Sequence, residues 1–167
     1  NLVMPGPDLS GKAIANLIVE EKVTVAAGVP TIWMAVLPEL KGRDTSSLRA
    51  IPCGGSAVPK ALSEGYRELT GLPILQAWGM TETSPMCVLS FPPRDAGPEE
   101  ALIWQAKSGR PVAGMEVRIV DDADQPLAED GQTIGHLQLR GPWVTAGYHL
   151  QPEGQGSISP DGWLRTG

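Results

Sequence analysis

The sequence predicts an α/β fold in which a parallel sheet with flanking helices precedes a small antiparallel, β-barrel-like subdomain. Apolar runs alternate with segments of helical period through about residue 105. Beyond it, apolar and polar side chains alternate with a period of two. Gly and Pro make up 36 of 167 residues (20 and 16), a turn-rich share that stays below the roughly 25–30% of disordered chains. We therefore expect two folded parts, residues 1–105 and 106–167.

Strands and helices alternate through the first part. The expected strands are 2–4, 23–27, 48–53 and 74–78. The expected helices begin after a Ser10 cap, at Pro30 and at Pro59, and end near Lys22, at Gly42 and at Gly71. A β-α-β order of this kind predicts parallel strands, and ligands bind at the carboxyl ends of such strands. The loops 53–59 and 78–85 are therefore the ones expected to carry function.

A polar, Pro-rich connector over 92–100 leads to the second part. Residues 115–120 and 136–140 alternate in polarity and predict two antiparallel strands. Residues 121–126 form a turn between them, because they combine aspartates with a proline.

The charge of the chain argues against nucleic-acid binding. Thirteen basic and 19 acidic residues give a net charge of -6. Counts of 8 basic and 11 acidic residues up to residue 105, and of 5 and 8 after it, leave each part at -3 without a basic stripe. No apolar run approaches the roughly 18–20 residues of a membrane span. Two cysteines are too few for a disulfide framework, so we expect a soluble, cytoplasmic protein.

The strongest local signal is the segment 76–85, Gln-Ala-Trp-Gly-Met-Thr-Glu-Thr-Ser-Pro. The Thr81 hydroxyl can donate to a phosphate oxygen, the Glu82 carboxylate can hold Mg²⁺, and Trp78 can stack on a purine. The alternative is a strand that ends in a helix cap, with Thr81 or Thr83 as the cap and Trp78 in the core. Local chemistry alone favours this alternative, because such short motifs recur by chance.

The second signal is the segment 53–59, Cys-Gly-Gly-Ser-Ala-Val-Pro, which also follows an expected strand. Its paired glycines allow a flat ligand to lie against the backbone. An ordinary turn from strand to helix is at least as good an explanation when this segment is taken by itself.

Taken in order, the motifs resemble the adenylate-forming superfamily, which includes AMP-binding acyl-CoA synthetases, luciferases and the adenylation domains of peptide synthetases. The resemblance extends over essentially the whole chain, and the Trp-Gly-Met-Thr-Glu element is its most specific part. The combination of the Val-Pro-Thr-Ile-Trp segment at 29–33 with Trp-Gly-Met-Thr-Glu-Thr-Ser-Pro at 78–85 is most similar to the medium- and long-chain fatty-acyl branch. The matching segments are 28–31, 54–57, 78–82, 109–111, 135–148 and 163–167.

The resemblance implies a role for each residue of the two loops. It places Gly55, Ser56 and Ala57 on one side of adenine, Trp78 on the other, and Thr81 on the α-phosphate. Glu82 is implied to bind Mg²⁺. The residues implied to contact the nucleotide are Gly55, Ser56, Ala57, Trp78, Gly79, Met80 and Thr81. The residues implied to lie near the acyl pocket are Gly54, Gln76 and Ala77.

The resemblance also implies a reaction with ATP, Mg²⁺ and coenzyme A. A carboxylate attacks the α-phosphate of ATP to give an acyl-adenylate and pyrophosphate, and the thiol of coenzyme A then displaces AMP. The chain begins with Asn1, ends at Gly167 and carries no Ser/Thr/Gly-rich phosphate loop. We therefore expect a middle fragment of the N-terminal domain of a larger ligase, which by itself does not catalyse the reaction.

Two alternatives stay open. An amino-acid-activating adenylation domain usually carries an Asp in the pocket that holds the substrate amine. Residues expected to face the pocket here are apolar or neutral, which favours an acyl substrate. A non-catalytic nucleotide-binding module is the other alternative, and the presence of both Thr81 and Glu82 weighs against it.

Overall fold

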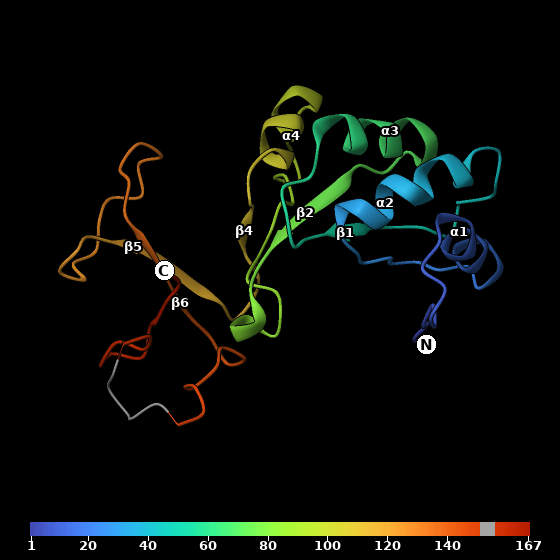
Figure 1. Ribbon diagram of the computed structural model, residues 1–167. Helices are drawn as coiled ribbons and strands as arrows, with labels where there is room; N and C mark the ends of the chain where they lie inside the picture. The colour runs from blue at the N-terminus through green and yellow to red at the C-terminus, as the bar shows by residue number, and fades with distance from the viewer. Residues whose placement is uncertain (151–155) are drawn as a thin grey trace. The chain divides into compact units, whose positions relative to one another are not determined.

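The computed structural model describes residues 1–150 and 156–167 (Figure 1). The helices are α1 (Gly11–Glu20), α2 (Pro30–Val36), α3 (Lys60–Thr70) and α4 (Pro98–Gln105), with 3-10 turns η1 (Leu37–Leu40) and η2 (Thr81–Thr83). The strands are β1 (Ile51–Cys53), β2 (Ile74–Trp78), β3 (Val88–Leu89), β4 (Arg110–Pro111), β5 (Glu116–Val120), β6 (His136–Arg140) and β7 (Leu164–Arg165). Two compact units result, one of residues 1–78 and 88–110, the other of 79–87 and 111–167.

The helices of the first unit begin and end largely where the sequence predicts. The Ser10 side chain accepts a hydrogen bond from the Ala13 N–H at 3.3 Å and caps α1. Pro30 occupies the first turn of α2, where its missing N–H costs nothing. Gly71 ends α3 with a φ of 78°, a left-handed conformation that a glycine adopts without strain.

The sheet of the first unit is mixed rather than entirely parallel. Strands β1 and β2 are parallel, as predicted, with Cys53 opposite Gln76. Strand β3 runs antiparallel to β2, with Ala77 opposite Leu89. The expectation of a purely parallel sheet is corrected here because the short link 79–87 contains no crossover helix, and a parallel return needs a longer connection.

Two of the expected strands do not form. The prediction of a strand at 2–4 is wrong, since Leu2 and Met4 are 85% and 72% exposed and no strand is assigned there. The segment 23–27 is reduced to a single isolated bridge, which joins Val25 to Ala50. The expected connector at 92–100 runs into helix α4, whose first turn is stabilised by Glu99 and Glu100 at the positive end of the helix dipole.

The core of the first unit packs helices α1–α3 against β1 and β2, and these elements lie side by side in Figure 1. The rings of Trp33 and Tyr66 meet edge to face at 6.0 Å. The Tyr66 hydroxyl donates a hydrogen bond to the Trp33 carbonyl oxygen at 2.9 Å, so this buried polar atom is satisfied. Burial raises the pKa of the Tyr66 hydroxyl above its usual range.

The second unit contains an open antiparallel sheet in the order β5-β6-β7. Strands β5 and β6 pair from Glu116↔Arg140 to Val120↔His136. The sheet does not close into the expected barrel, because the three strands assigned in the described residues are too few to close a sheet on itself. The guanidinium groups of Arg118 and Arg140 both lie over the Trp163 ring, 4.2 and 4.5 Å from its centroid.

Across residues 1–150 and 156–167, no helix combines the length and the apolar character needed to cross a membrane.

Candidate functional site

The turn that follows β2 is built around a glycine that nothing larger can replace. A Cβ atom placed on Gly79 would overlap the carbonyl oxygen of Pro85 and lie 2.9 Å from the Thr83 hydroxyl oxygen. The sequence predicts close approach of a ligand to this glycine. That stays a prediction, and what the structure itself shows is a close approach of the turn to itself within the tight loop 79–86.

Thr83 and Thr81 have different environments in this turn. Thr83 is fully buried, and its hydroxyl oxygen accepts the Met80 N–H at 2.9 Å and lies 2.7 Å from the Pro85 carbonyl oxygen. Thr81 is exposed. The capping residue is therefore Thr83, and the Thr81 hydroxyl is left accessible to a ligand.

A second segment, Trp143 to Tyr148, is bonded to this turn, and we call it the 143–148 segment. The Thr145 N–H donates to the Glu82 carbonyl oxygen at 2.8 Å, and the Ser84 hydroxyl donates to the Trp143 carbonyl oxygen at 3.1 Å. The Trp143 indole N–H donates to the Met86 carbonyl oxygen, also at 3.1 Å. The backbone around Glu82 is therefore held by residues some 60 positions further along the chain.

The Glu82 carboxylate accepts a hydrogen bond from the Tyr148 hydroxyl at 2.8 Å through its Oε1 atom. This bond raises the pKa of Tyr148, because it stabilises the protonated phenol beside an acceptor. No cluster of three or more potential metal ligands occurs among the described residues. A single carboxylate still fits Mg²⁺, which proteins commonly hold through one or two carboxylates together with phosphate oxygens and water.

The loop 54–58 of the first unit is anchored at both ends. The Gly54 N–H donates to the Gly28 carbonyl oxygen at 3.1 Å, and the Val58 N–H donates to the Gln76 side-chain oxygen Oε1 at 3.2 Å. Between these anchors Gly55, with a φ of 86°, Ser56 and Ala57 are exposed. The loop is therefore fixed at both ends, while its three middle residues face solvent.

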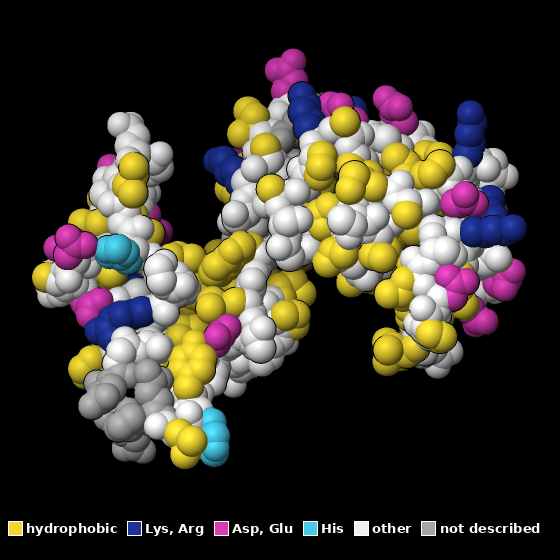
Figure 2. Space-filling view, viewed as in Figure 1, with side chains coloured by type: hydrophobic (Ala, Val, Ile, Leu, Met, Phe, Trp, Pro, Cys, Tyr) yellow, Lys and Arg dark blue, Asp and Glu magenta, His cyan; other side chains and the backbone are white. Residues whose placement is uncertain are grey.

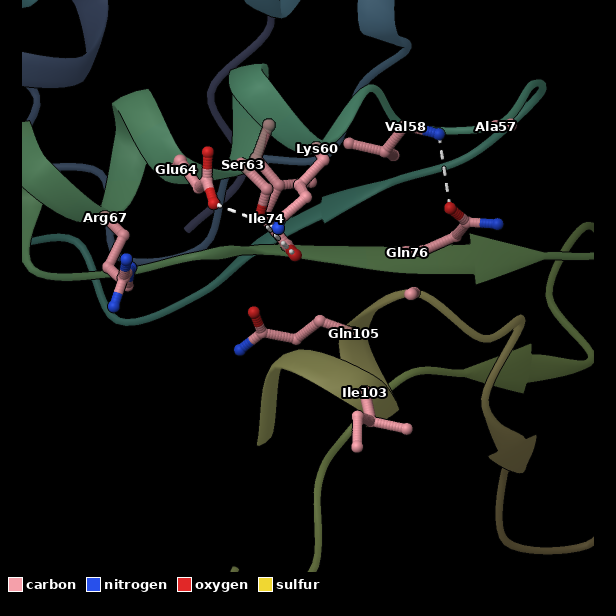
Figure 3. Close-up of a pocket in the computed structure, with 11 residues that line it drawn as sticks. Ala57, Val58, Lys60, Ser63, Glu64, Arg67, Ile74, Gln76, Ile103 and Gln105 are labelled. Atoms are coloured by element: carbon pink, nitrogen blue, oxygen red, sulfur yellow. Dashed lines mark hydrogen bonds and ion pairs between the residues drawn. The ribbon is translucent and has the colours of Figure 1, made fainter. Parts of the chain in front are cut away.

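Strand β2 carries its candidate residues on two faces. A Cβ atom on Gly54 would lie 3.6 Å from that of Ala77, so Gly54 and Ala77 share one face. Successive strand residues alternate, which puts Gln76 and Trp78 on the other face. Figure 3 shows Gln76 at a cavity of about 400 Å³, bordered by α3, β2 and the end of α4. Trp78 is only partly buried, unlike the core position of the alternative interpretation.

The sequence-predicted residues therefore fall into two groups. The first unit holds Gly54, Gly55, Ser56, Ala57, Gln76, Ala77 and Trp78. The second holds Gly79, Met80, Thr81 and Glu82. The sequence did not predict the bond from Tyr148 to Glu82. The Gly147-Tyr148 pair stands out only as part of a motif, and no local pattern indicates a partner 66 residues away.

Comparison with known proteins places these features in context. A family described as AMP-binding enzyme matches residues 1–149. A long-chain-fatty-acid–CoA ligase of Thermus thermophilus is 37% identical over 99% of the chain, and a 3-methylmercaptopropionyl-CoA ligase of Ruegeria pomeroyi is 42% identical over the same share. The crystal structure of a long-chain-fatty-acid-CoA ligase of Archaeoglobus fulgidus matches 95% of the chain and 34% of its own, with a TM-score of 0.77 and 26% identity. The chain spans 31% of the length of these two curated relatives.

Proposed function

The chain belongs to the AMP-binding enzyme family, and from that premise we propose that its parent protein is an ATP-dependent acyl-CoA ligase. The supporting observation is that three side chains of the turn 79–86 have different environments. Thr83 makes the internal hydrogen bonds of the turn, Thr81 is left accessible, and Glu82 is held by the 143–148 segment. A threonine hydroxyl and a carboxylate in this arrangement suit a phosphate group and its counter-ion.

The residues of each unit are proposed to have their own part in nucleotide binding. The exposed backbone of Gly55, Ser56 and Ala57 provides one surface for adenine, and the ring of Trp78 provides the other. Thr81 donates to the α-phosphate, in a turn whose backbone is set by Gly79 and Met80. Glu82 would hold Mg²⁺. The ion supplies neutralisation of the charge that develops on the phosphate oxygens during transfer.

The proposed reaction has two steps. The acid needs no general base, because its carboxylate is ionised at neutral pH and attacks the α-phosphate directly. Thr81 stabilises the charge on the phosphoryl group while pyrophosphate leaves. The thiol of coenzyme A then attacks the acyl carbonyl, a thioester forms and AMP leaves. Gly54 and Ala77, on one face of the sheet, are proposed to lie near the acyl group.

A medium- or long-chain fatty acid is the proposed substrate. Support comes from relatives named for fatty acids of medium and long chain.

The parent protein is proposed to be cytoplasmic. The buried thiols of Cys53 and Cys87 agree with a reducing, cytoplasmic setting.

Adenylate formation by the full-length parent tests the proposal. ATP–pyrophosphate exchange is measured with fatty acids of graded length and, in separate reactions, with amino acids as alternative substrates. We expect exchange with fatty acids, and a loss of about 100-fold or more in Glu82→Gln and Thr81→Val, as for groups that stabilise transition-state charge. Glu129→Gln, an exposed change in the same unit, serves as the control. The proposal would be overturned if only amino acids supported exchange, or if none of the tested acids did.

A further inference from the structure

Gln76 lies in strand β2, and its side chain contacts the neighbouring loop 54–58 of the same unit. Its side-chain oxygen Oε1 accepts the N–H of Val58 at 3.2 Å, as the dashed line in Figure 3 shows. The bond joins the middle of β2 to the residue that follows Ala57, across 18 positions of sequence. It is the second of the two anchors of the loop 54–58 described above.

The face of the strand separates Gln76 from the acyl side. Gln76 lies opposite Cys53, a residue of the core cluster, on the face that carries α3. Ala77 lies on the opposite face, against Gly54. A role for Gln76 in contacting the acyl group would require it to share a face with Ala77, and it does not.

Trp78 lies on the same strand face as Gln76, two residues further on. Residues two apart on a strand are separated by about 6.6 Å. The residue that bonds the loop and the residue proposed to stack on adenine are therefore next to each other on one face of the same strand.

We propose that Gln76 is a positioning residue that holds the backbone of Gly55–Ala57 at the correct spacing from Trp78 for adenine. This inference rests on the proposed function for the identity of the ligand, and it assigns Gln76 to the nucleotide rather than to the acid. Without the bond, the exposed loop loses one of its two hydrogen bonds to the rest of the unit, and part of the binding free energy of ATP goes into ordering it.

Equilibrium binding of ATP to the full-length parent is the primary test. Gln76→Leu keeps the volume but removes the acceptor, and we expect ATP affinity to fall about 3- to 10-fold, the value of one hydrogen bond. Gln76→Glu keeps an acceptor oxygen and should restore affinity to within about twofold. Gln76→Asn is a second variant that removes the bond, because the shorter side chain does not reach Val58. Ser63→Ala, which removes a weak 3.5 Å bond to Ile74 in the same cavity, is the matched control.

Two further measurements separate a positioning role from a general structural one. Hydrogen exchange of the peptide containing Val58 should accelerate in Gln76→Leu and not in Ser63→Ala. In ATP–pyrophosphate exchange, the KM for ATP should rise while the KM for the acid and the chain-length preference stay unchanged. A changed acid KM with unchanged ATP affinity would overturn the inference and return Gln76 to the acyl pocket.

The outcomes distinguish this inference from the proposed function. A wild-type parent that binds ATP but forms no adenylate would disprove the ligase, and the binding and hydrogen-exchange arms would still decide the role of Gln76. Unchanged ATP affinity in both Gln76→Leu and Gln76→Asn would overturn the inference alone. A wild-type parent that binds no ATP would overturn both.

Discussion

The hydroxyl of Tyr148 donates a hydrogen bond to the carboxylate of Glu82, 2.8 Å away and 66 residues earlier in the chain. The Thr145 N–H also donates to the backbone carbonyl of Glu82. Backbone and side chain of the same residue are therefore oriented by one segment of the second unit. This leaves fewer rotamers for the carboxylate to lose when it binds a cation.

Replacing Tyr148 with Phe removes only the hydroxyl that touches Glu82. Because the carboxylate is then less well oriented, we expect the Mg²⁺ concentration for half-maximal pyrophosphate exchange by the parent to rise about 3- to 10-fold. Activity at saturating Mg²⁺ should change less. Tyr66→Phe removes a hydroxyl bonded in the core and is the control. An equal Mg²⁺ shift in both variants would contradict this prediction.

Thr83→Val and Thr81→Val should differ in their effect on the free energy of unfolding. Thr83→Val leaves the Met80 N–H without its acceptor in a buried turn, so we expect a destabilisation of about 1–3 kcal/mol. Thr81 is exposed, and its replacement should leave stability within about 0.5 kcal/mol. Urea denaturation of the two variants of the parent protein measures both changes in the free energy of unfolding. A larger loss of stability in Thr81→Val than in Thr83→Val would show that the hydroxyls have exchanged roles.

The thiol of Cys53 should resist alkylation in the folded protein. Burial raises its pKa to about 11, so roughly one molecule in a thousand carries the reactive thiolate at pH 8. Mass spectrometry after treatment with iodoacetamide should find Cys53 unmodified until denaturant is added. Rapid labelling of native protein at this position would mean that the core around β1 opens readily.

Acid should weaken the second unit through its ion pairs. The hydrogen bond from Arg165 lowers the pKa of Asp124, and the bond from Arg140 lowers that of Glu116. A carboxylate with a lowered folded-state pKa contributes stability that is present above its unfolded pKa of about 4 and is lost as the pH falls through the folded value. The protection of peptides covering 116–140 against hydrogen exchange, measured relative to the intrinsic exchange rate at each pH, should therefore fall below about pH 4. The Asp124→Asn variant should show a weaker pH dependence than the wild type.

Elements with strong local signals were predictable from the sequence. Strands β2 and β6 have the bounds that their apolar patterns indicate, and the Ser10 cap and the Gly71 terminus were confirmed. Helix α4 escaped prediction because its residues lack an apolar stripe of helical period. The antiparallel course of β3 depends on a turn whose shape comes from the fit of Gly79 against Pro85, which no periodicity encodes.

The candidate residues were predictable by type but not by relationship. Thr81 and Glu82 stand out because a hydroxyl and a carboxylate after a strand suit phosphate and a cation. The pairing of Glu82 with Tyr148 and that of Gln76 with Val58 join distant positions. Such contacts depend on the tertiary fold, so one sequence without an alignment does not reveal them.

The second unit is assembled from two separate stretches, 79–87 and 111–167, and the chain leaves it for 88–110 in between. A recombinant piece that begins at residue 111 would keep Tyr148 and lose Glu82. Exchange of this unit between related proteins therefore requires both stretches to be transplanted together as a discontinuous cassette. A single crossover anywhere between them would join a turn from one parent to a 143–148 segment from the other, so the side-chain bond between positions 82 and 148 would form only where both parents supply matching residues.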